Sequence, residues 1–129
     1  LRELGHTVYD FKNPPGRTGF AWSELDPDWL SWTPEQYREA LKHPLALAGF
    51  NADFTAMNAA DLCVLVLPSG RSASWEFGWC LGEGKRGIVF MPEACEPELM
   101  YLGNQITTNY DELAEDVEMV AAFLSFNNL

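Results

Sequence analysis

Basic residues are scarce in this chain. It holds 8 Lys and Arg against 19 Asp and Glu, which gives a formal net charge of -11. A phosphate backbone or an anionic lipid surface would repel such a chain, so the charge argues against binding to nucleic-acid polymers and to anionic membranes. The net charge does not exclude binding of small anionic ligands, because the positive charge of a single nearby Arg can outweigh the repulsion from the rest of the chain.

Cysteines are few, and no long apolar run occurs. Cys63, Cys80 and Cys95 are odd in number and share no metal-type spacing. We therefore interpret them as reduced thiols of a cytoplasmic protein. No stretch is long and apolar enough to span a bilayer, and we expect no secretory leader before the first element.

The apolar content is ample for a core. The chain has 129 residues, of which 47% are hydrophobic, and this predicts a single domain over residues 1–129. Residues 1–6 are typical of the last turn of a helix, with Gly5 just past its end, and residues 7–11 are typical of a strand. A helix end before the first strand predicts that the domain is N-terminally incomplete and lacks its first strand.

Strand and helix patterns alternate along the rest of the chain. Residues 62–67 form an unbroken apolar run, which is typical of a parallel strand covered on both faces. Thr33 to Gln36 is a capping box that begins a helix, and Pro44 ends or kinks it. The sequence predicts an α/β fold with a three-layer doubly wound parallel sheet, flavodoxin-like or Rossmann-like. The predicted elements after residue 11 are helices over 34–42, 45–59, 74–83, 97–102 and 110–126, and strands over 62–67, 87–91 and 105–108.

Residues 13–30 form a long loop punctuated by Pro and Gly. The loop carries Phe20, Trp22 and Trp29 and is too long for an ordinary connection, so it is a candidate lid over a site. Aromatic loops also simply cover the edge of a core, and the sequence leaves both alternatives open.

The loop after strand 62–67 is rich in small residues. The segment Ser69 to Ser74 supplies backbone N–H groups, hydroxyls and the Arg71 guanidinium at a predicted helix N-terminus. These groups suit a phosphate or sugar hydroxyls, so Gly70, Arg71, Ser72 and Ser74 are candidate substrate-binding residues. The loop lacks the Gly-Lys-Ser/Thr ending of ATP-type loops and the three-glycine spacing of dinucleotide binders. In the simpler alternative, Ser74 only caps the helix and Gly70 only forms a turn.

Glu76 is the candidate nucleophile. Open α/β sheets bind ligands past the carboxyl ends of their strands, and a helix dipole there keeps a carboxylate ionised. Trp75, Phe77 and Trp79 surround Glu76 with apolar groups, and we expect Gly78 to let helix and sheet approach closely. Such a carboxylate can attack the anomeric carbon of a sugar. Alternatively, Glu76 only stabilises the helix start, by about 0.3–1 kcal/mol.

Asp53 is a second candidate catalytic residue. It lies on the predicted helix 45–59, on the side of Phe50, Phe54 and Met57. A charged group beside an apolar face lies either near a helix end or toward a cleft, and we favour the cleft.

The order of these features resembles a known family. Asp53 is followed eight residues later by Asp61, then by an apolar strand, the small-residue loop, Glu76-Phe-Gly, a strand and Glu98-Leu-Met. This succession, over roughly half of the chain, is similar to the nucleoside 2-deoxyribosyltransferase family. More loosely, residues 68–76 resemble the signature loop of cytokinin-type nucleoside-monophosphate phosphoribohydrolases. Both families cleave an N-glycosidic bond.

The resemblance implies a role for each matching residue. Glu76 corresponds to the nucleophile that forms a covalent glycosyl-enzyme, and Asp53 to the aspartate that helps to protonate the leaving base. Leu99 and Met100 correspond to a segment that reaches into the neighbouring subunit's site, which implies a homodimer or a higher homo-oligomer. Glu98 stands where the transferases carry an Asn at the 5′ side of the sugar.

The chain departs from the transferases at the 5′ side. Where they hold a free 5′-hydroxyl with an Asp, this chain has Gly70, Arg71 and Ser72. A guanidinium beside hydroxyls favours a 5′-phosphate, as in the related deoxynucleoside 5′-monophosphate N-glycosidases. Glu98 would repel that phosphate unless Arg71 pairs with it.

The resemblance therefore implies cleavage or transfer at the N-glycosidic bond of a small nucleoside or nucleotide. We expect no metal and no redox cofactor, because the nucleophile is a carboxylate and the sequence contains no ligand cluster. The alternative is a noncatalytic nucleotide-binding or sensing domain of the same fold.

Overall fold

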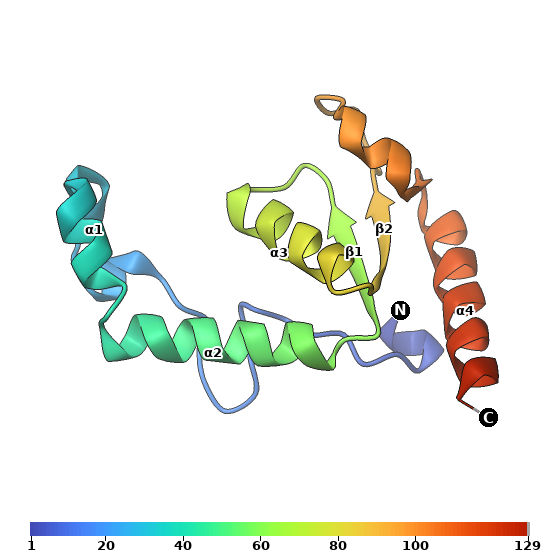
Figure 1. The fold of residues 1–129 in the computed structure, drawn as a ribbon, viewed down its shortest axis with the longest axis horizontal. Helices are drawn as coiled ribbons and strands as arrows, with labels where there is room; N and C mark the ends of the chain where they lie inside the picture. Colours follow the sequence, from blue (N-terminus) through green and yellow to red (C-terminus); the bar gives the residue numbers. More distant parts are fainter. Residues whose placement is uncertain (129) are drawn as a thin grey trace. The chain divides into compact units, whose positions relative to one another are not determined.

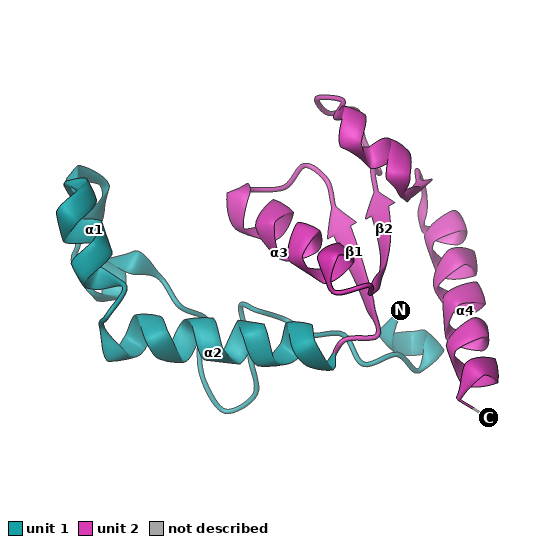
Figure 2. Cartoon of the chain, viewed as in Figure 1, with its two compact units in different colours: residues 1–59 teal, residues 60–129 magenta. Residues whose placement is uncertain are grey.

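The computed structural model describes residues 1–128. The chain divides into two compact units, Leu1–Ala59 and Ala60–Leu129 (Figure 2). Within residues 1–128, no helix combines the length and apolar character needed to cross a membrane. The single domain over residues 1–129 stays a prediction.

The first unit consists of helices and turns. The sequence correctly predicts the left-handed residue after the first helical turn, Gly5, whose φ is 91°. The capping box is also confirmed, because the Gln36 N–H donates to Thr33 Oγ1 over 3.2 Å and the Thr33 N–H to Gln36 Oε1 over 2.8 Å. The elements are η1 (Arg2–Leu4), η2 (Trp22–Glu24), η3 (Trp29–Ser31), α1 (Pro34–Ala40) and α2 (Pro44–Ala59) (Figure 1).

The predicted strand over residues 7–11 is wrong. Residues 6–10 have no regular structure, and Val8, Tyr9 and Phe11 are all exposed. A strand is stable only when its backbone groups pair with a neighbouring strand, and no strand of the described sheet pairs with this segment. Asp10 instead stabilises a turn, in which its carboxylate accepts hydrogen bonds from the Lys12 N–H and the Asn13 amide.

The aromatic residues of the long loop pack inside the first unit. Trp22 contacts Phe20, Trp32 and Tyr37 edge-on, with ring centroids 4.8, 5.8 and 5.8 Å away. Phe20 lies on α2 at Gly49, where an added Cβ would stand 2.9 Å from the Phe20 Cβ. These contacts favour the alternative in which the loop covers a core edge.

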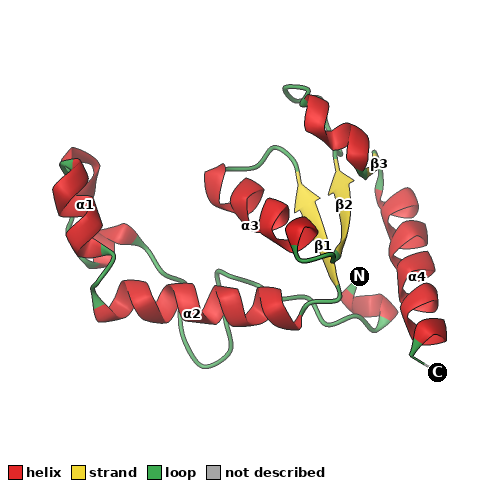
Figure 3. Ribbon diagram, viewed as in Figure 1, coloured by secondary structure: helices red, strands yellow, loops and turns green. Residues whose placement is uncertain are grey.

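The second unit contains a parallel sheet. β1 pairs with β2, and β2 with β3, so the strand order is β1-β2-β3. The predicted mixed α/β class with a parallel sheet is confirmed. The elements are β1 (Leu62–Val66), α3 (Arg71–Gly82), β2 (Arg86–Phe90), η4 (Leu99–Gly103), β3 (Gln105–Thr107) and α4 (Tyr110–Asn127) (Figure 3).

The core of this unit consists of two apolar clusters. Successive side chains of a strand point to opposite faces. Val89 of β2 packs in one cluster with Phe77 of α3, whereas its neighbour Ile88 packs in the other with Leu113 and Val117 of α4. α3 and α4 therefore contact opposite faces of β2, and the apolar run Ile88 to Phe90 of that strand reflects the double coverage.

The close approach of helix and sheet occurs at Gly87, not at Gly78. The prediction for Gly78 is wrong, because that residue is exposed and an added Cβ would meet no atom within 4 Å. At Gly87 on β2, an added Cβ would stand 2.5 Å from Leu81 Cδ2 and 2.8 Å from Phe77 Cε2. The missing side chain of Gly87 is what lets α3 lie close to the sheet.

Candidate functional site

The candidate site begins in the loop between β1 and α3. α3 begins at Arg71, after Gly70 with φ −85° and ψ −179°, which is three residues earlier than predicted. The idea that Ser74 caps this helix is therefore wrong. Its hydroxyl lies inside the first turn and donates to the Gly70 carbonyl over 3.2 Å. An added Cβ at Gly70 would meet nothing within 4 Å, so the backbone there does not require glycine.

The structure brings the predicted substrate-binding residues of this loop together. Gly70, Arg71, Ser72 and Ser74 all lie at the first turn of α3, where Gly70, Arg71 and Ser72 are exposed. The backbone N–H groups of a first turn have no partner within the helix and can bind an anion. Arg71 forms no side-chain hydrogen bond or ion pair with any residue in the described part of the chain. Its guanidinium is thus available to a ligand at this turn.

Glu76 lies deeper along the helix than the sequence predicts. It stands five residues after Arg71, in the second turn of α3. The field of a helix dipole falls off within the first turn. The predicted effect of the helix dipole on Glu76 is therefore wrong.

The pKa of the Cys63 thiol depends on residues of α3 that include Cys80 and Glu76. Burial raises the pKa of Cys63, which lies on β1, to about 12, and a hydrogen bond with Cys80 of α3 adds to the effect. Two smaller effects follow, because the Lys85 ammonium lowers this pKa and the Glu76 carboxylate raises it. Glu76 and Cys80 are four residues apart and share one side of α3. That side faces β1.

Next to the side of α3 that carries Glu76 and Cys80, the side with Phe77 and Leu81 lies over β2. Phe77 and Leu81 stand above Gly87, as the distances to its added Cβ show. β1 is an edge strand of the three described strands, since its partner in that sheet is β2 alone. Glu76 therefore lies on the β1 side of α3 with Cys80, on the helix that begins past the carboxyl end of β1.

The raised pKa of Cys63 predicts a slowly reacting thiol. At about pH 8, a shift of the pKa from 9.0 to about 12 lowers the thiolate fraction on the order of a thousandfold. We expect iodoacetamide to label Cys63 far more slowly in the folded protein than in the denatured chain, as measured by peptide mass spectrometry. Because the folded pKa is above the unfolded one, the protein should also lose stability as the pH rises from about 9 to 12. Equal labelling rates in both states would contradict the raised pKa of the half-buried Cys63 thiol.

Asp53 lies on α2 in the first unit. It is half-buried, and its Oδ1 accepts a hydrogen bond from the Tyr9 hydroxyl over 2.8 Å. Tyr9 also lines a hollow of about 510 Å³ with residues that include Pro14, Asn51 and Thr55. Sequence reasoning missed Tyr9, because its contact with Asp53 spans 44 positions and no local pattern signals it. That Asp53 faces a cleft stays a prediction.

Glu98 and Met100 lie at the start of η4. Glu98 Oε1 accepts a hydrogen bond from the Met100 N–H over 3.1 Å, so the carboxylate caps this helical turn. Within residues 1–128, Arg71 and Glu98 form no ion pair, and the pairing that would offset the repulsion of a phosphate by Glu98 is thus not present. Leu99, Met100 and Leu102 are 80%, 76% and 87% exposed and form an apolar surface.

Metal-ligating side chains do not cluster in residues 1–128, where no three His, Cys, Asp or Glu residues are grouped closely enough to hold an ion. Comparisons of the chain with protein-family models, with curated proteins and with solved structures give no match. The resemblance to the nucleoside 2-deoxyribosyltransferases and the roles that it implies therefore stay predictions.

Proposed function

We propose that this chain cleaves or transfers the N-glycosidic bond of nucleosides or their 5′-monophosphates, with Glu76 as the nucleophile. The observation that carries the proposal is the position of Glu76. It is a half-buried carboxylate in the second turn of α3, the helix that follows the carboxyl end of the edge strand β1. Ligands of open α/β sheets bind at that end of the strands.

The proposed reaction has two steps. The Glu76 carboxylate attacks C1′ of the sugar, the N-glycosidic bond breaks, and the base leaves with the bonding electrons and takes a proton. Asp53 is the proposed proton donor or hydrogen-bond partner of that base. In the second step, water or a second base attacks C1′, gives up a proton, and releases the Glu76 carboxylate. No metal or redox cofactor takes part in this scheme.

Binding of a 5′-phosphate is assigned to the first turn of α3. The backbone N–H groups after Gly70, the Ser72 and Ser74 hydroxyls and the Arg71 guanidinium are together at that turn. This set combines a helix N-terminus with a guanidinium, and both favour a phosphate. Glu98 and Met100, exposed at the start of η4, are assigned to the substrate site by the resemblance, which places Met100 in the site of a neighbouring subunit.

Arg71→Ala is expected to discriminate between substrates. The KM for 5′-monophosphates should rise about tenfold or more, because a charge-assisted hydrogen bond to phosphate is lost, while the KM for nucleosides stays nearly unchanged. Steady-state kinetics on both substrates measure the difference. Arg86→Ala is the control, since Arg86 lies at the amino end of β2 with its guanidinium over the Phe123 ring. A uniform loss on both substrates would refute the phosphate assignment.

The architecture around this site is proposed to be a three-layer doubly wound sheet of the flavodoxin-like type. The packing of α3 and α4 on opposite faces of β2 supports it. We also propose a cytoplasmic homodimer or higher homo-oligomer. The exposed apolar surface of Leu99, Met100 and Leu102 suits a subunit contact, and the three free thiols suit a reducing compartment.

A noncatalytic nucleotide-binding domain is the second candidate. The two hollows described in the structure are lined by residues of the first unit, and neither includes Glu76. A chromatographic screen of nucleosides and 5′-monophosphates for free base separates the two functions. Release of base supports the enzyme, whereas saturable binding without release supports the sensor.

A further inference from the structure

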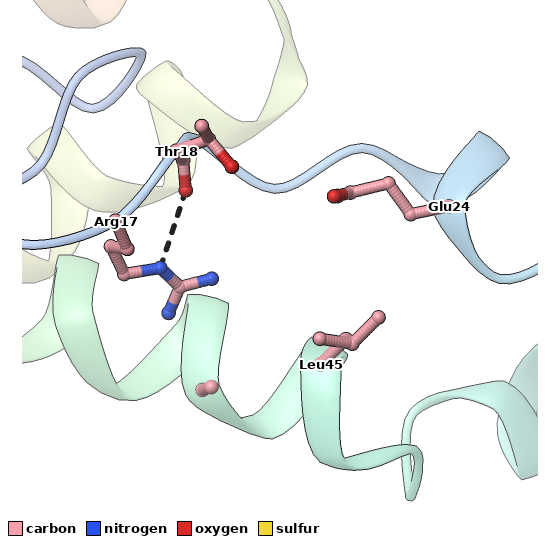
Figure 4. A pocket seen from close by; sticks show the side chains of 5 residues that line it. Arg17, Thr18, Glu24 and Leu45 are labelled. Carbon is pink, nitrogen blue, oxygen red and sulfur yellow. Dashed lines mark hydrogen bonds between the residues drawn. The ribbon is translucent and has the colours of Figure 1, made fainter.

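A second hollow in the first unit has opposite charges on its wall. Its volume is about 370 Å³, and it lies between the long loop and α2 (Figure 4). The lining residues are Arg17, Thr18, Glu24, Leu45 and Ala48. None of them belongs to the proposed N-glycosidic site.

The loop that carries Arg17 is closed on itself. The Gly19 N–H donates to the Lys12 carbonyl over 3.0 Å, and the Arg17 N–H to the Pro14 carbonyl over 3.2 Å. A Cβ at position 19 would stand 2.8 Å from the Phe11 carbonyl oxygen, so only glycine permits this closure. Arg17 is thereby held on a short, hydrogen-bonded loop.

The Arg17 side chain is fixed at one end and unpaired at the other. Its Nε donates to the Thr18 carbonyl over 3.3 Å, as the dashed line in Figure 4 shows. The terminal nitrogens Nη1 and Nη2 have no hydrogen-bond or ion-pair partner within residues 1–128. They present four N–H donors in a plane that suits a carboxylate.

The Glu24 carboxylate likewise has one oxygen that is hydrogen-bonded and one that has no partner among the residues that the structure describes. Its Oε2 accepts a hydrogen bond from the Ala21 N–H over 2.7 Å, whereas Oε1 has no partner in the described part of the chain. In Figure 4, the Arg17 and Glu24 side chains point toward the same space from two sides. The two side chains, both described in the structure, do not form an ion pair with each other.

We propose that this hollow binds a small zwitterion, namely an α-amino acid with an aliphatic side chain. The ligand carboxylate pairs with the Arg17 guanidinium, and its ammonium group pairs with the Glu24 carboxylate. Leu45 and Ala48 offer the aliphatic side chain an apolar surface. Arg17 is half-buried and Glu24 is exposed. A ligand with one charge alone makes only one of the two charge-assisted contacts, so the site favours molecules that carry both charges.

Isothermal titration with three probes tests the proposal. L-Leucine carries both charges, isovalerate only the carboxylate, and isoamylamine only the ammonium group. We expect L-leucine to bind in about the millimolar range and each single-charge probe at least about tenfold more weakly. The measurement needs no catalytic activity, so its result is separate from the fate of the N-glycosidic proposal.

Matched variants assign the two charges. Arg17→Met and Glu24→Gln should each weaken L-leucine binding about tenfold or more, because each removes one charge-assisted contact. In Glu24→Gln, the new amide oxygen can still accept from the Ala21 N–H, and near-ultraviolet circular dichroism of the Trp22 cluster verifies that the unit remains folded. Arg38→Met and Glu35→Gln alter exposed residues of α1 outside the hollow and should leave binding unchanged.

Three results would overturn the proposal. The first is the absence of saturable L-leucine binding by the folded wild-type protein up to about 20 mM, roughly tenfold above the expected range. The second is isovalerate binding as tight as that of L-leucine, which would mean an anion site only. The third is full binding by folded Arg17→Met or Glu24→Gln, which would locate the ligand elsewhere.

Discussion

Glu76→Gln is expected to reduce the release of free base by at least about a thousandfold, on nucleosides and on 5′-monophosphates alike. An amide cannot form the glycosyl ester that a carboxylate forms with C1′. The side chain keeps its size and its place on α3, so binding of the unreacted nucleotide should change little. A loss in kcat with an unchanged dissociation constant is therefore the expected signature.

Glu83→Gln is the matched control for that experiment. Glu83 directly follows α3 and is exposed, at the end of the helix remote from the first turn, where phosphate binding is proposed. Its replacement removes the same charge from the protein and should leave base release unchanged. If Glu76→Gln turns over at the wild-type rate, Glu76 is not the nucleophile. If wild-type protein binds nucleotides but releases no base, the domain is a sensor.

The regular elements of the second unit could be predicted because their patterns are local. The apolar run at residues 62–67 predicts a strand, and β1 occupies Leu62–Val66. Its coverage on both faces is incomplete, because Val66 is 55% exposed. Leu113 and Val117 lie at helical spacing in the closing helix, and both are buried. The capping box at Thr33 works for the same reason, since its partners are three residues apart.

The wrong predictions concern features that depend on residues outside the local segment. Residues 7–11 have strand-forming side chains, but a strand also needs a neighbour to pair with. Ser74 is a good capping residue, yet α3 already begins at Arg71, and Gly70 with its extended backbone is the N-cap residue. Gly78 lies two residues after Glu76 on α3, whereas the close contact with the sheet comes from Gly87 on β2.

The candidate site residues also fall into those that local sequence groups together and those whose positions depend on contacts between distant segments. Gly70, Arg71, Ser72 and Ser74 come together because they belong to one helical turn, so sequence alone could group them. The flank on which Glu76 lies is set by packing of α3 on β1 and β2, which the sequence does not specify. Contacts across a long loop, such as the Tyr9 hydroxyl to Asp53, depend entirely on the fold of the first unit.

Substitution by alanine at two glycines of the second unit should change the free energy of unfolding in opposite directions. Gly87→Ala places a Cβ 2.5 Å from Leu81 Cδ2 and 2.8 Å from Phe77 Cε2, so α3 or these side chains must shift. Overpacking of this kind costs about 1–3 kcal/mol of the free energy of unfolding. Gly78→Ala fills open space on the exposed side of α3 and should add about 0.5–1 kcal/mol, because alanine favours the helix over glycine.

Urea unfolding monitored by far-ultraviolet circular dichroism measures both changes. Each variant is the control for the other, since both add one methyl group, to β2 in Gly87→Ala and to α3 in Gly78→Ala. The double variant should retain most of the loss seen in Gly87→Ala, because the gain at Gly78 lies on the outer side of the helix and does not relieve the contact at the sheet. If Gly87→Ala is as stable as the wild-type protein, α3 does not lie as close to β2 as the structure shows, and the flank assigned to Glu76 must be assigned anew.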